Sequence, residues 1–231
     1  MAFAVKALLD LTGTMVCCTE IEDDNERENR GVMIVAIILS AGESRRMGRP
    51  KALLPIGGVT FLEQIVSAFK ASKAGEIIVV LGHNAEAIRS KIAHLPARIV
   101  INPDYARGQL SSLQVAIRAL DEAKVDGLLV HLVDQPFLDT ALVNRMIDRF
   151  YESKKAIVVP AHKGRRGHPV LFSRRLFQEL LDAPLDQGAK AVVRAHATET
   201  LEIETDDERV ALDIDTPDEY ERHIGRNTHS H

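Results

Sequence analysis

A basic, glycine-containing stretch follows the first strongly apolar run of the chain. "SAGESRRMGRPK" covers residues 40–51 and holds a single acidic residue. Gly42 and Gly48 let a backbone turn sharply, and backbone N–H groups in such a loop can bind an anion. Arg46 and Lys51 would add charge-assisted hydrogen bonds to phosphate oxygens. Neither GxxxxGK[ST] nor GxGxxG is present, so the residues leave two interpretations open: a phosphate-binding loop or a solvated loop.

Two aspartates follow apolar runs elsewhere in the chain. Asp134 comes directly after "GLLVHLV", and Asp215 lies in "LDIDTP". Mg²⁺ prefers oxygen ligands and usually combines one or two carboxylates with substrate phosphates and water. Both aspartates are therefore candidate metal ligands. Each has an alternative, since Asp134 could cap the next turn and Asp213 competes with Asp215. Thr216 is placed to cap the following helix, which leaves Asp215 free.

The elements that position these residues alternate regularly from Met33 onward. Apolar, β-branched runs predict strands, and runs with apolar residues three or four apart predict helices. The predicted strands are 33–39, 76–82, 98–102, 127–133, 156–160, 168–172, 201–204 and 210–214. The predicted helices are 60–73, 84–95, 111–123, 140–151, 173–181, 188–196 and one that begins after Thr216. Repeated strand–helix units predict an α/β fold, a Rossmann-like, doubly wound and mostly parallel sheet, with 156–172 as a small β-hairpin insertion.

The chain divides into three predicted parts. Residues 1–32 form an N-terminal extension whose run "TEIEDDNERENRG" has no hydrophobic period, so we expect it to be poorly ordered. Residues 33–225 form the folded domain, and 226–231 form a tail. Ligands of such sheets bind beyond the carboxyl ends of the strands, and both aspartates and the basic loop fall there.

Composition argues against several functions. The 231 residues carry a formal net charge of −4 and contain no Trp, whereas nucleic-acid-binding domains are usually basic and often stack bases on aromatic rings. The only cysteines are adjacent, which disfavours a disulfide and predicts a cytoplasmic location. No apolar run is long enough to cross a membrane. We therefore expect small-molecule substrates and no nucleic-acid or membrane partner.

Four motifs together resemble one family. "AGESRRMGRPK" resembles the AGxSxRMGxxK signature of the MobA-like nucleotidyltransferases, and "VDQPF", "GHPV" and "DIDTP" follow in that family's order. The pattern is most similar to the molybdenum cofactor cytidylyltransferases. The resemblance implies a fold like that of the nucleotide-diphospho-sugar transferases. It also implies CTP and molybdopterin as substrates, pyrophosphate as product and Mg²⁺ (or Mn²⁺) as cofactor.

The resemblance also implies roles for particular residues. Lys51, Arg46 and Asp134 would be catalytic, with Lys51 stabilising charge as pyrophosphate leaves, and Asp134 and Asp215 would hold the metal. The residues implied to contact the nucleotide are Ser40, Ala41, Gly42, Ser44, Arg46, Met47, Gly48, Lys51, Gly82, Asn102, Ser111 and Ser112. Outside the signature the alternatives are structural: a turn glycine at 82, an Asn-Pro turn at 102 and a helix N-cap at 111 or 112.

The acceptor is implied to bind at two further motifs. Those residues are Arg166, Gly167, His168 and Pro169 in "KGRRGHPV", and Asp186 and Gly188 in "LDQGAK". The arginine has an alternative as a charged hairpin tip. "LDQGAK" departs from the family's "GDxGAR" at Leu185 and at Lys190, which keeps the charge but loses the bidentate fork of arginine.

The predicted function is transfer of CMP from CTP to the phosphate of molybdopterin. Ser40-Ala41-Gly42 resembles the Ala-Ala-Gly start typical of cytidylyl-transferring members but departs from it at Ser40. Two alternatives keep the chemistry, with GTP as donor or with a sugar or alcohol phosphate as acceptor. A third is a cofactor-binding maturation chaperone that serves a recipient molybdenum enzyme.

Overall fold

The computed structural model describes residues 33–225. The predicted extension (1–32) and tail (226–231) lie outside the described residues. Ten strands are described, and they are β1 (Met33–Ser40), β2 (Pro55–Ile56), β3 (Val59–Thr60), β4 (Ile77–Leu81), β5 (Arg98–Ile101), β6 (Val125–Leu132), β7 (Ile157–His162), β8 (Arg165–Arg166), β9 (Val170–Ser173) and β10 (Thr200–Glu204). The α-helices are α2 (Phe61–Lys70), α3 (Ala85–Ile92), α4 (Gln109–Arg118), α5 (Thr140–Ser153), α6 (Phe177–Asp182), α7 (Lys190–Ala195) and α8 (Pro217–His223).

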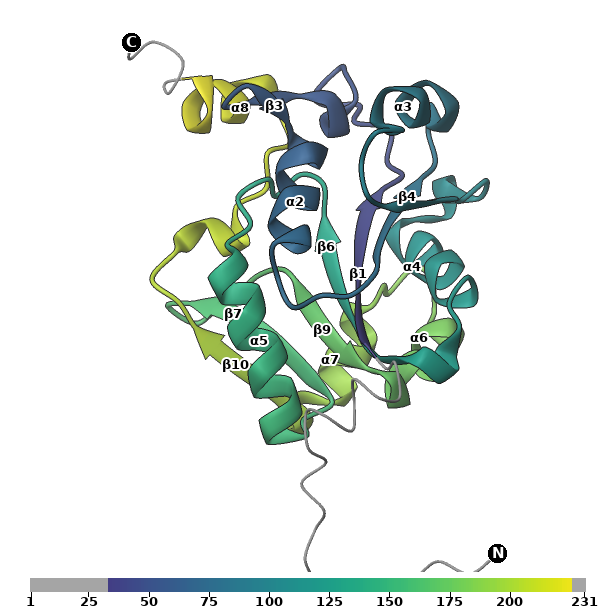
Figure 1. Ribbon diagram of the computed structural model, residues 1–231, viewed down its shortest axis with the longest axis vertical. Coiled ribbons are helices and arrows are strands. Elements are labelled where there is room, and N and C mark those ends of the chain that lie inside the picture. Colours follow the sequence, from purple (N-terminus) through teal and green to yellow (C-terminus); the bar gives the residue numbers. More distant parts are fainter. Residues whose placement is uncertain (1–32, 226–231) are drawn as a thin grey trace, which may run out of the picture. The chain divides into compact units, whose positions relative to one another are not determined.

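The main sheet has the order β10-β7-β9-β6-β1-β4-β5, and β8 pairs with β7. β1 is parallel to both β4 and β6, and β5 is parallel to β4. β9 is antiparallel to β6 and to β7, so it interrupts the parallel pairing. The predicted mostly parallel α/β sheet is confirmed. In Figure 1, β1 and β6 run upward, and their carboxyl ends lie toward α8 and β3.

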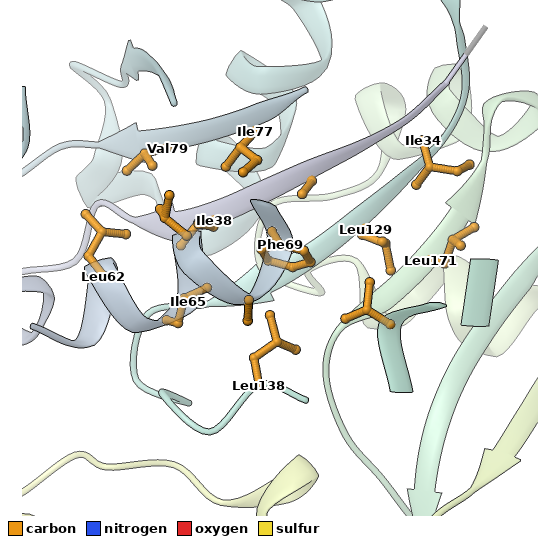
Figure 2. Packing of buried hydrophobic residues seen from close by; sticks show 14 of the residues in the cluster. Ile34, Ile38, Leu62, Ile65, Phe69, Ile77, Val79, Leu129, Leu138 and Leu171 are labelled. Atoms are coloured by element: carbon orange, nitrogen blue, oxygen red, sulfur yellow. The ribbon is translucent and has the colours of Figure 1, made fainter. Parts of the chain in front are cut away.

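Two apolar cores cover the two faces of this sheet. One packs side chains of α2, α3 and α5 against the strands, and the other packs α4, α6 and α7 on the opposite face. Figure 2 shows Leu62, Ile65 and Phe69 of α2 meeting strand residues such as Ile38 and Val79. Because β1 and β4 lie between both cores, almost every residue in them is apolar and buried.

A third, smaller apolar cluster ties the basic loop to α8. Met47 and Leu54 from the loop side pack with Ile214, Tyr220 and Ile224. β2 and β3 form a separate two-stranded sheet that leads from the loop into α2. The sequence did not predict this pair, since two residues per strand leave no periodic pattern to detect.

Predicted element boundaries hold where local signals are strong. Thr60 with Glu63 and Thr216 with Glu219 both form the expected capping boxes. The strand predicted for 210–214 is wrong: a 3-10 helix spans Glu208–Ala211, and an extended segment follows it. Its backbone groups bond singly to two loops and not to a neighbouring strand, with Val210 accepting from His168 and Ile214 donating to Asp134.

The remaining differences are small. α4 spans Gln109–Arg118 and not the predicted 111–123, because Gly108, with φ of 102°, precedes the helix and the chain turns again after Arg118. Among residues 33–225, no helix combines the length and the apolar character needed to cross a bilayer.

Candidate functional site

A cleft of about 510 Å³ opens at the carboxyl ends of β1 and β6. The basic loop after β1 forms one wall, and its residues in the cleft include Gly42, Ser44 and Lys51. The start of α3 and the junction before α4 form the opposite side, and Asp134 closes the end beside β6. The cleft thus lies where a parallel sheet is expected to bind its ligand.

A cluster of two cations and two carboxylates adjoins this cleft, and two of its members, Lys51 and Asp134, line it. The Lys51 ammonium donates to Asp134 Oδ2 at 3.0 Å and to Asp215 Oδ1, and Arg46 donates to Asp215 Oδ2 at 2.7 Å. The lysine side chain is only 10% exposed. Residues 83 and 164 positions distant from Lys51 therefore converge on one ammonium group. We call Arg46, Lys51, Asp134 and Asp215 the charge cluster.

Backbone contacts fix the geometry of the charge cluster. Ile214 N donates to the carbonyl of Asp134 at 2.8 Å, which joins the two aspartate-bearing segments. The Ser44 hydroxyl accepts from Lys51 N at 3.3 Å. Glu219, the capping-box residue of α8, also accepts from Asp215 N at 2.8 Å. A helix cap therefore holds the backbone of Asp215 directly.

The two carboxylates titrate differently. Burial raises the pKa of Asp134 above its usual value, and this outweighs the nearby Lys51 cation. Partial burial also pushes the pKa of Asp215 upward, but hydrogen bonds and charges from Lys51 and Arg46 hold it below its usual value. Desolvation favours the neutral acid and a cation favours the carboxylate. A further cation at the cluster would favour ionised Asp134.

The donor set fits a divalent cation. Asp134 Oδ1 is buried and has no hydrogen-bond partner among the described residues, although buried carboxylate oxygens usually have one. No group of three or more His, Cys, Asp or Glu side chains in residues 33–225 is arranged to hold a metal. Two carboxylates completed by substrate phosphates and water match Mg²⁺ or Mn²⁺, which prefer oxygen.

Most of the predicted signature residues line the cleft, whereas Met47 is buried beside it. Ser40, Ala41, Gly42, Ser44, Gly48 and Lys51 line it. Met47 is buried in the third apolar cluster, and its backbone N–H and that of Gly48 both donate to Ser44 O. Ser44 and Gly48 have φ of 53° and 73°, so the loop folds back on itself as a nest-forming backbone does.

The other predicted nucleotide residues lie at different depths. Ser112 lines the cleft, whereas Asn102 is fully buried and donates to the hydroxyls of Ser111 and Ser112 at 2.9 Å each. A Cβ on Gly82 would lie 2.5 Å from Tyr105 Cβ and 2.7 Å from Ala41 O, so a side chain there would separate the strand end from the loop. Nucleotide contact by these residues stays a prediction.

The predicted acceptor residues do not form one group. His168 N donates to Val210, in the segment before Asp215, whereas Gly167 N donates to Pro160 of β7. Gly167 also packs closely against the segment before Asp215, because a Cβ there would lie 1.9 Å from Val210 O. Arg166 forms an ion pair with Glu202 at 2.7 Å. Asp186 lines a second cavity, between the start of α4 and the loop after α6. Gly188 begins the turn into α7 with φ of 66°, and Pro169 leads into β9.

Two side chains beside the charge cluster, His131 and Gln135, were not predicted, and they connect to Asp213, which the sequence offered only as a competitor of Asp215. Gln135 donates to Asp213 Oδ1 at 2.7 Å, and His131 bonds to the backbone carbonyl of Gln135 at 2.8 Å. Burial lowers the pKa of His131 to about 3 and that of His168 to about 4, so both are neutral. His131 lies on a buried strand, where a histidine usually indicates packing. The only sequence signal for a role of His131 near the site is that it lies four residues before Gln135.

His83 and Tyr105 were also missed. Both line the cleft, and His83 Nδ1 lies 3.2 Å from the Tyr105 hydroxyl with the rings edge to face. His83 lies shortly after the end of β4, and Tyr105 lies shortly after the end of β5. Their positions after strand ends are the signal that could have identified them.

Comparison with known proteins agrees with this geometry. The family model described as MobA-like NTP transferase domain matches residues 36–200. Nicotine blue oxidoreductase of Paenarthrobacter nicotinovorans is 32% identical over 82% of this chain and 95% of its own length. Molybdenum cofactor cytidylyltransferase of Escherichia coli K12 is 30% identical over 81% of this chain and 93% of its own.

Solved structures extend the comparison. Rv0371c of Mycobacterium tuberculosis H37Rv superimposes with a TM-score of 0.76 and 32% identity, covering 84% of this chain and 98% of that one. Its complex with manganese gives a TM-score of 0.71 and 29% identity, with 84% and 99% covered.

The fold and the charge cluster beside the basic loop define an enzyme of the nucleotidyltransferase class. The family model matches more than half of the chain, which therefore belongs to the MobA-like NTP transferase domain family.

Proposed function

We propose that this enzyme transfers CMP from CTP to the phosphate of molybdopterin and releases pyrophosphate, with Mg²⁺ or Mn²⁺ as cofactor. The observation that carries the proposal is the charge cluster, in which Lys51 and Arg46 meet Asp134 and Asp215 at the end of a cleft formed by the basic loop. Residues 33–225 would carry the whole reaction, in the cytoplasm, and a molybdenum enzyme would receive the product.

The reaction is an in-line displacement at the α-phosphorus of the nucleotide. A bond forms from a phosphate oxygen of the acceptor to that phosphorus, and the bond from the phosphorus to the oxygen bridging toward the β-phosphate breaks. The acceptor phosphate is already anionic near neutral pH, so no strong general base is needed. Catalysis then consists of positioning and charge stabilisation, with Lys51 and Arg46 as the cations nearest to the leaving pyrophosphate.

Asp134 and Asp215 would hold the metal ion. When bound, the ion supplies positive charge to phosphate oxygens in the transition state. Asp134 has an unpaired buried oxygen for it, and Asp215 is already held ionised by its two cations. Supporting this assignment, a homologous structure contains manganese.

Three further observations support the choice of substrates. Ser40, Ala41 and Gly42 line the cleft in the order that resembles cytidylyl-transferring members. The turn at Gly167–Pro169 lies beside the segment that leads to Asp215, since His168 N donates to Val210. An acceptor bound at this turn would lie beside the segment that carries Asp215. The E. coli relative named a molybdenum cofactor cytidylyltransferase supports the same acceptor.

The test is pyrophosphate release with each of the four NTPs, with molybdenum cofactor or a sugar phosphate as acceptor. We expect release with CTP and molybdenum cofactor. Preference for GTP would correct the base, and release with a sugar phosphate alone would correct the acceptor. Cofactor binding without release would favour a maturation chaperone. Reduction of a dye by NAD(P)H without release would favour the activity named for the P. nicotinovorans relative.

Asp134→Asn provides the matched variant. It keeps the size and one oxygen of the side chain but removes its charge, so we expect metal-dependent release to fall by about 100-fold or more while the circular dichroism spectrum is unchanged. Asp126→Asn on the opposite end of β6 is the control, and it should retain wild-type turnover. Full activity of Asp134→Asn would show that the metal binds elsewhere.

A further inference from the structure

Arg49 is a cation of the cleft that the sequence pattern did not mark. Three lysine or arginine side chains line the cleft: Arg45, Arg49 and Lys51. Arg45 pairs with Glu43, and Lys51 pairs with both aspartates of the charge cluster. Within residues 33–225, Arg49 has no carboxylate within ion-pair distance and makes no hydrogen bond from its guanidinium. Its charge is therefore available to a ligand.

Arg49 instead lies over an aromatic ring. Its guanidinium carbon is 5.4 Å from the centroid of the Tyr220 ring, within the range of a cation–π contact. Such a contact restrains the direction of the guanidinium without consuming its five N–H donors in ion pairs. Arg49 is thus oriented and still able to bind an anion.

Two contacts hold the Tyr220 side chain in place. Its hydroxyl donates to the carbonyl of Pro55 at 2.7 Å, and its ring stacks on Phe61 with centroids 6.1 Å apart. It belongs to α8, whose capping residue Glu219 holds Asp215 N. One short helix therefore carries both a support for Arg49 and the backbone clamp of a carboxylate in the charge cluster.

We infer that Arg49 is a further phosphate-binding residue, which contacts the pyrophosphate portion of the nucleotide, and that Tyr220 is its positioning residue. The inference rests on the proposed function. A nucleoside triphosphate brings several negative charges into a cleft where Lys51 and Arg45 already have carboxylate partners. An oriented, unpaired guanidinium on the same loop complements that charge, and its planar donors suit phosphate oxygens.

Calorimetric binding of inorganic pyrophosphate with Mg²⁺ to the full-length protein tests Arg49 without an acceptor or a base. We expect Arg49→Ala to weaken binding about tenfold, and Arg49→Lys to recover part of the loss because it keeps charge but not the fork. Arg149→Ala is the control, since Arg149 is an exposed residue of α5 that pairs with Glu152. Equal affinity of Arg49→Ala and Arg149→Ala would overturn the inference.

Tyr220 is tested with two substitutions. Tyr220→Phe keeps the ring and loses only the bond to Pro55, so we expect near-wild-type affinity. Tyr220→Leu removes the ring and should weaken pyrophosphate binding about threefold. In turnover with CTP, both Arg49→Ala and Tyr220→Leu should raise KM for the nucleotide more than they lower kcat.

A double variant separates positioning from general destabilisation. Adding Tyr220→Leu to Arg49→Ala should change affinity no further, because the residue that Tyr220 positions is already absent. The positioning role would be refuted if the double variant lost pyrophosphate affinity by the product of the two single losses. Equal losses of affinity in Tyr220→Phe and Tyr220→Leu would also refute it. If the wild-type protein binds pyrophosphate and all variants bind it with the same affinity, this inference is refuted and the proposed function is not. A wild-type protein that binds neither pyrophosphate nor any NTP would refute the proposed function with it.

Discussion

Replacement of Lys51 by methionine tests the charge cluster through protein stability. The variant keeps the length and the apolar stem of the side chain and removes only the charge. Two carboxylates would then face each other with one cation fewer, because Lys51 bonds both Asp134 and Asp215 in the native protein. We expect Lys51→Met to lower the free energy of unfolding at pH 7.

The magnitude follows from burial. Removing one partner of a buried ion pair costs about 3–5 kcal/mol, because the remaining charge stays buried without a partner. The side chains of Asp134 and Asp215 are 24% and 23% exposed, and the solvent that reaches them screens part of the effect. We therefore expect a loss of about 2–3 kcal/mol. Lys73→Met is the control: its ion pair with Asp148 is 55% and 44% exposed, so it should cost at most about 1 kcal/mol.

The loss should depend on pH with a defined sign. Burial raises the pKa of Asp134 in the folded protein, and Lys51 opposes this rise. Without Lys51 the folded pKa rises further above the unfolded value near 3.8. The folded state then binds more protons than the unfolded state between those two values, so stability falls as pH rises through that window. Acidification from pH 7 should therefore restore part of the lost stability.

Urea unfolding followed by circular dichroism at several pH values measures both effects. The expected result is a large loss for Lys51→Met that shrinks toward acidic pH, and a small loss for Lys73→Met. Equal losses for the two variants, or a Lys51→Met loss that grows on acidification, would refute the reasoning that Lys51 compensates two carboxylates.

Two further predictions concern the segment beneath the cluster. A Cβ at Gly167 would lie 1.9 Å from the backbone oxygen of Val210, so Gly167→Ala should lower the stability measured by thermal unfolding by about 3 kcal/mol. Gly42→Ala is the control, because a Cβ there meets no atom within 4 Å and the variant should fold normally. His131 and His168 have folded pKa values of about 3 and about 4, so they gain protons mainly on unfolding and stability should fall as pH drops below 6.5, by up to about 1.4 kcal/mol per pH unit each. His168→Gln should make that decline shallower in urea unfolding, and an unchanged decline would contradict the assignment.

The sequence predicts the sheet and the position of the site because their signals are local. Apolar runs of β1 and β4 and the capping box at Thr60 depend on neighbouring residues only. The sites at strand ends follow from the general rule for parallel sheets. The bonding of Lys51 to two aspartates depends on contacts across 83 and 164 positions, which spacing along the chain does not encode.

Tertiary contacts also explain what the sequence did not reveal. The alternating apolar pattern of 210–214 is typical of a strand, yet its backbone bonds singly to Asp134 and His168 and pairs with no strand of residues 33–225. Arg49 occupies a variable position of the signature, and its partner Tyr220 bonds to Pro55 across 165 positions. Residues whose role depends on such pairs become visible only in the folded chain.

The reversed direction of β9 has a consequence for how this enzyme can diversify. Because β9 is antiparallel to β6, its first residue, Val170, pairs with Val130 near the carboxyl end of β6. The turn at His168 thus reaches the chemical edge of the sheet from the start of a strand, while the basic loop reaches it from the end of one. The carboxyl edge of the sheet is therefore reached by two segments that lie far apart in the chain. Under the proposed function, changes in the turn between β7 and β9 would alter acceptor binding and leave the basic loop and the charge cluster in place.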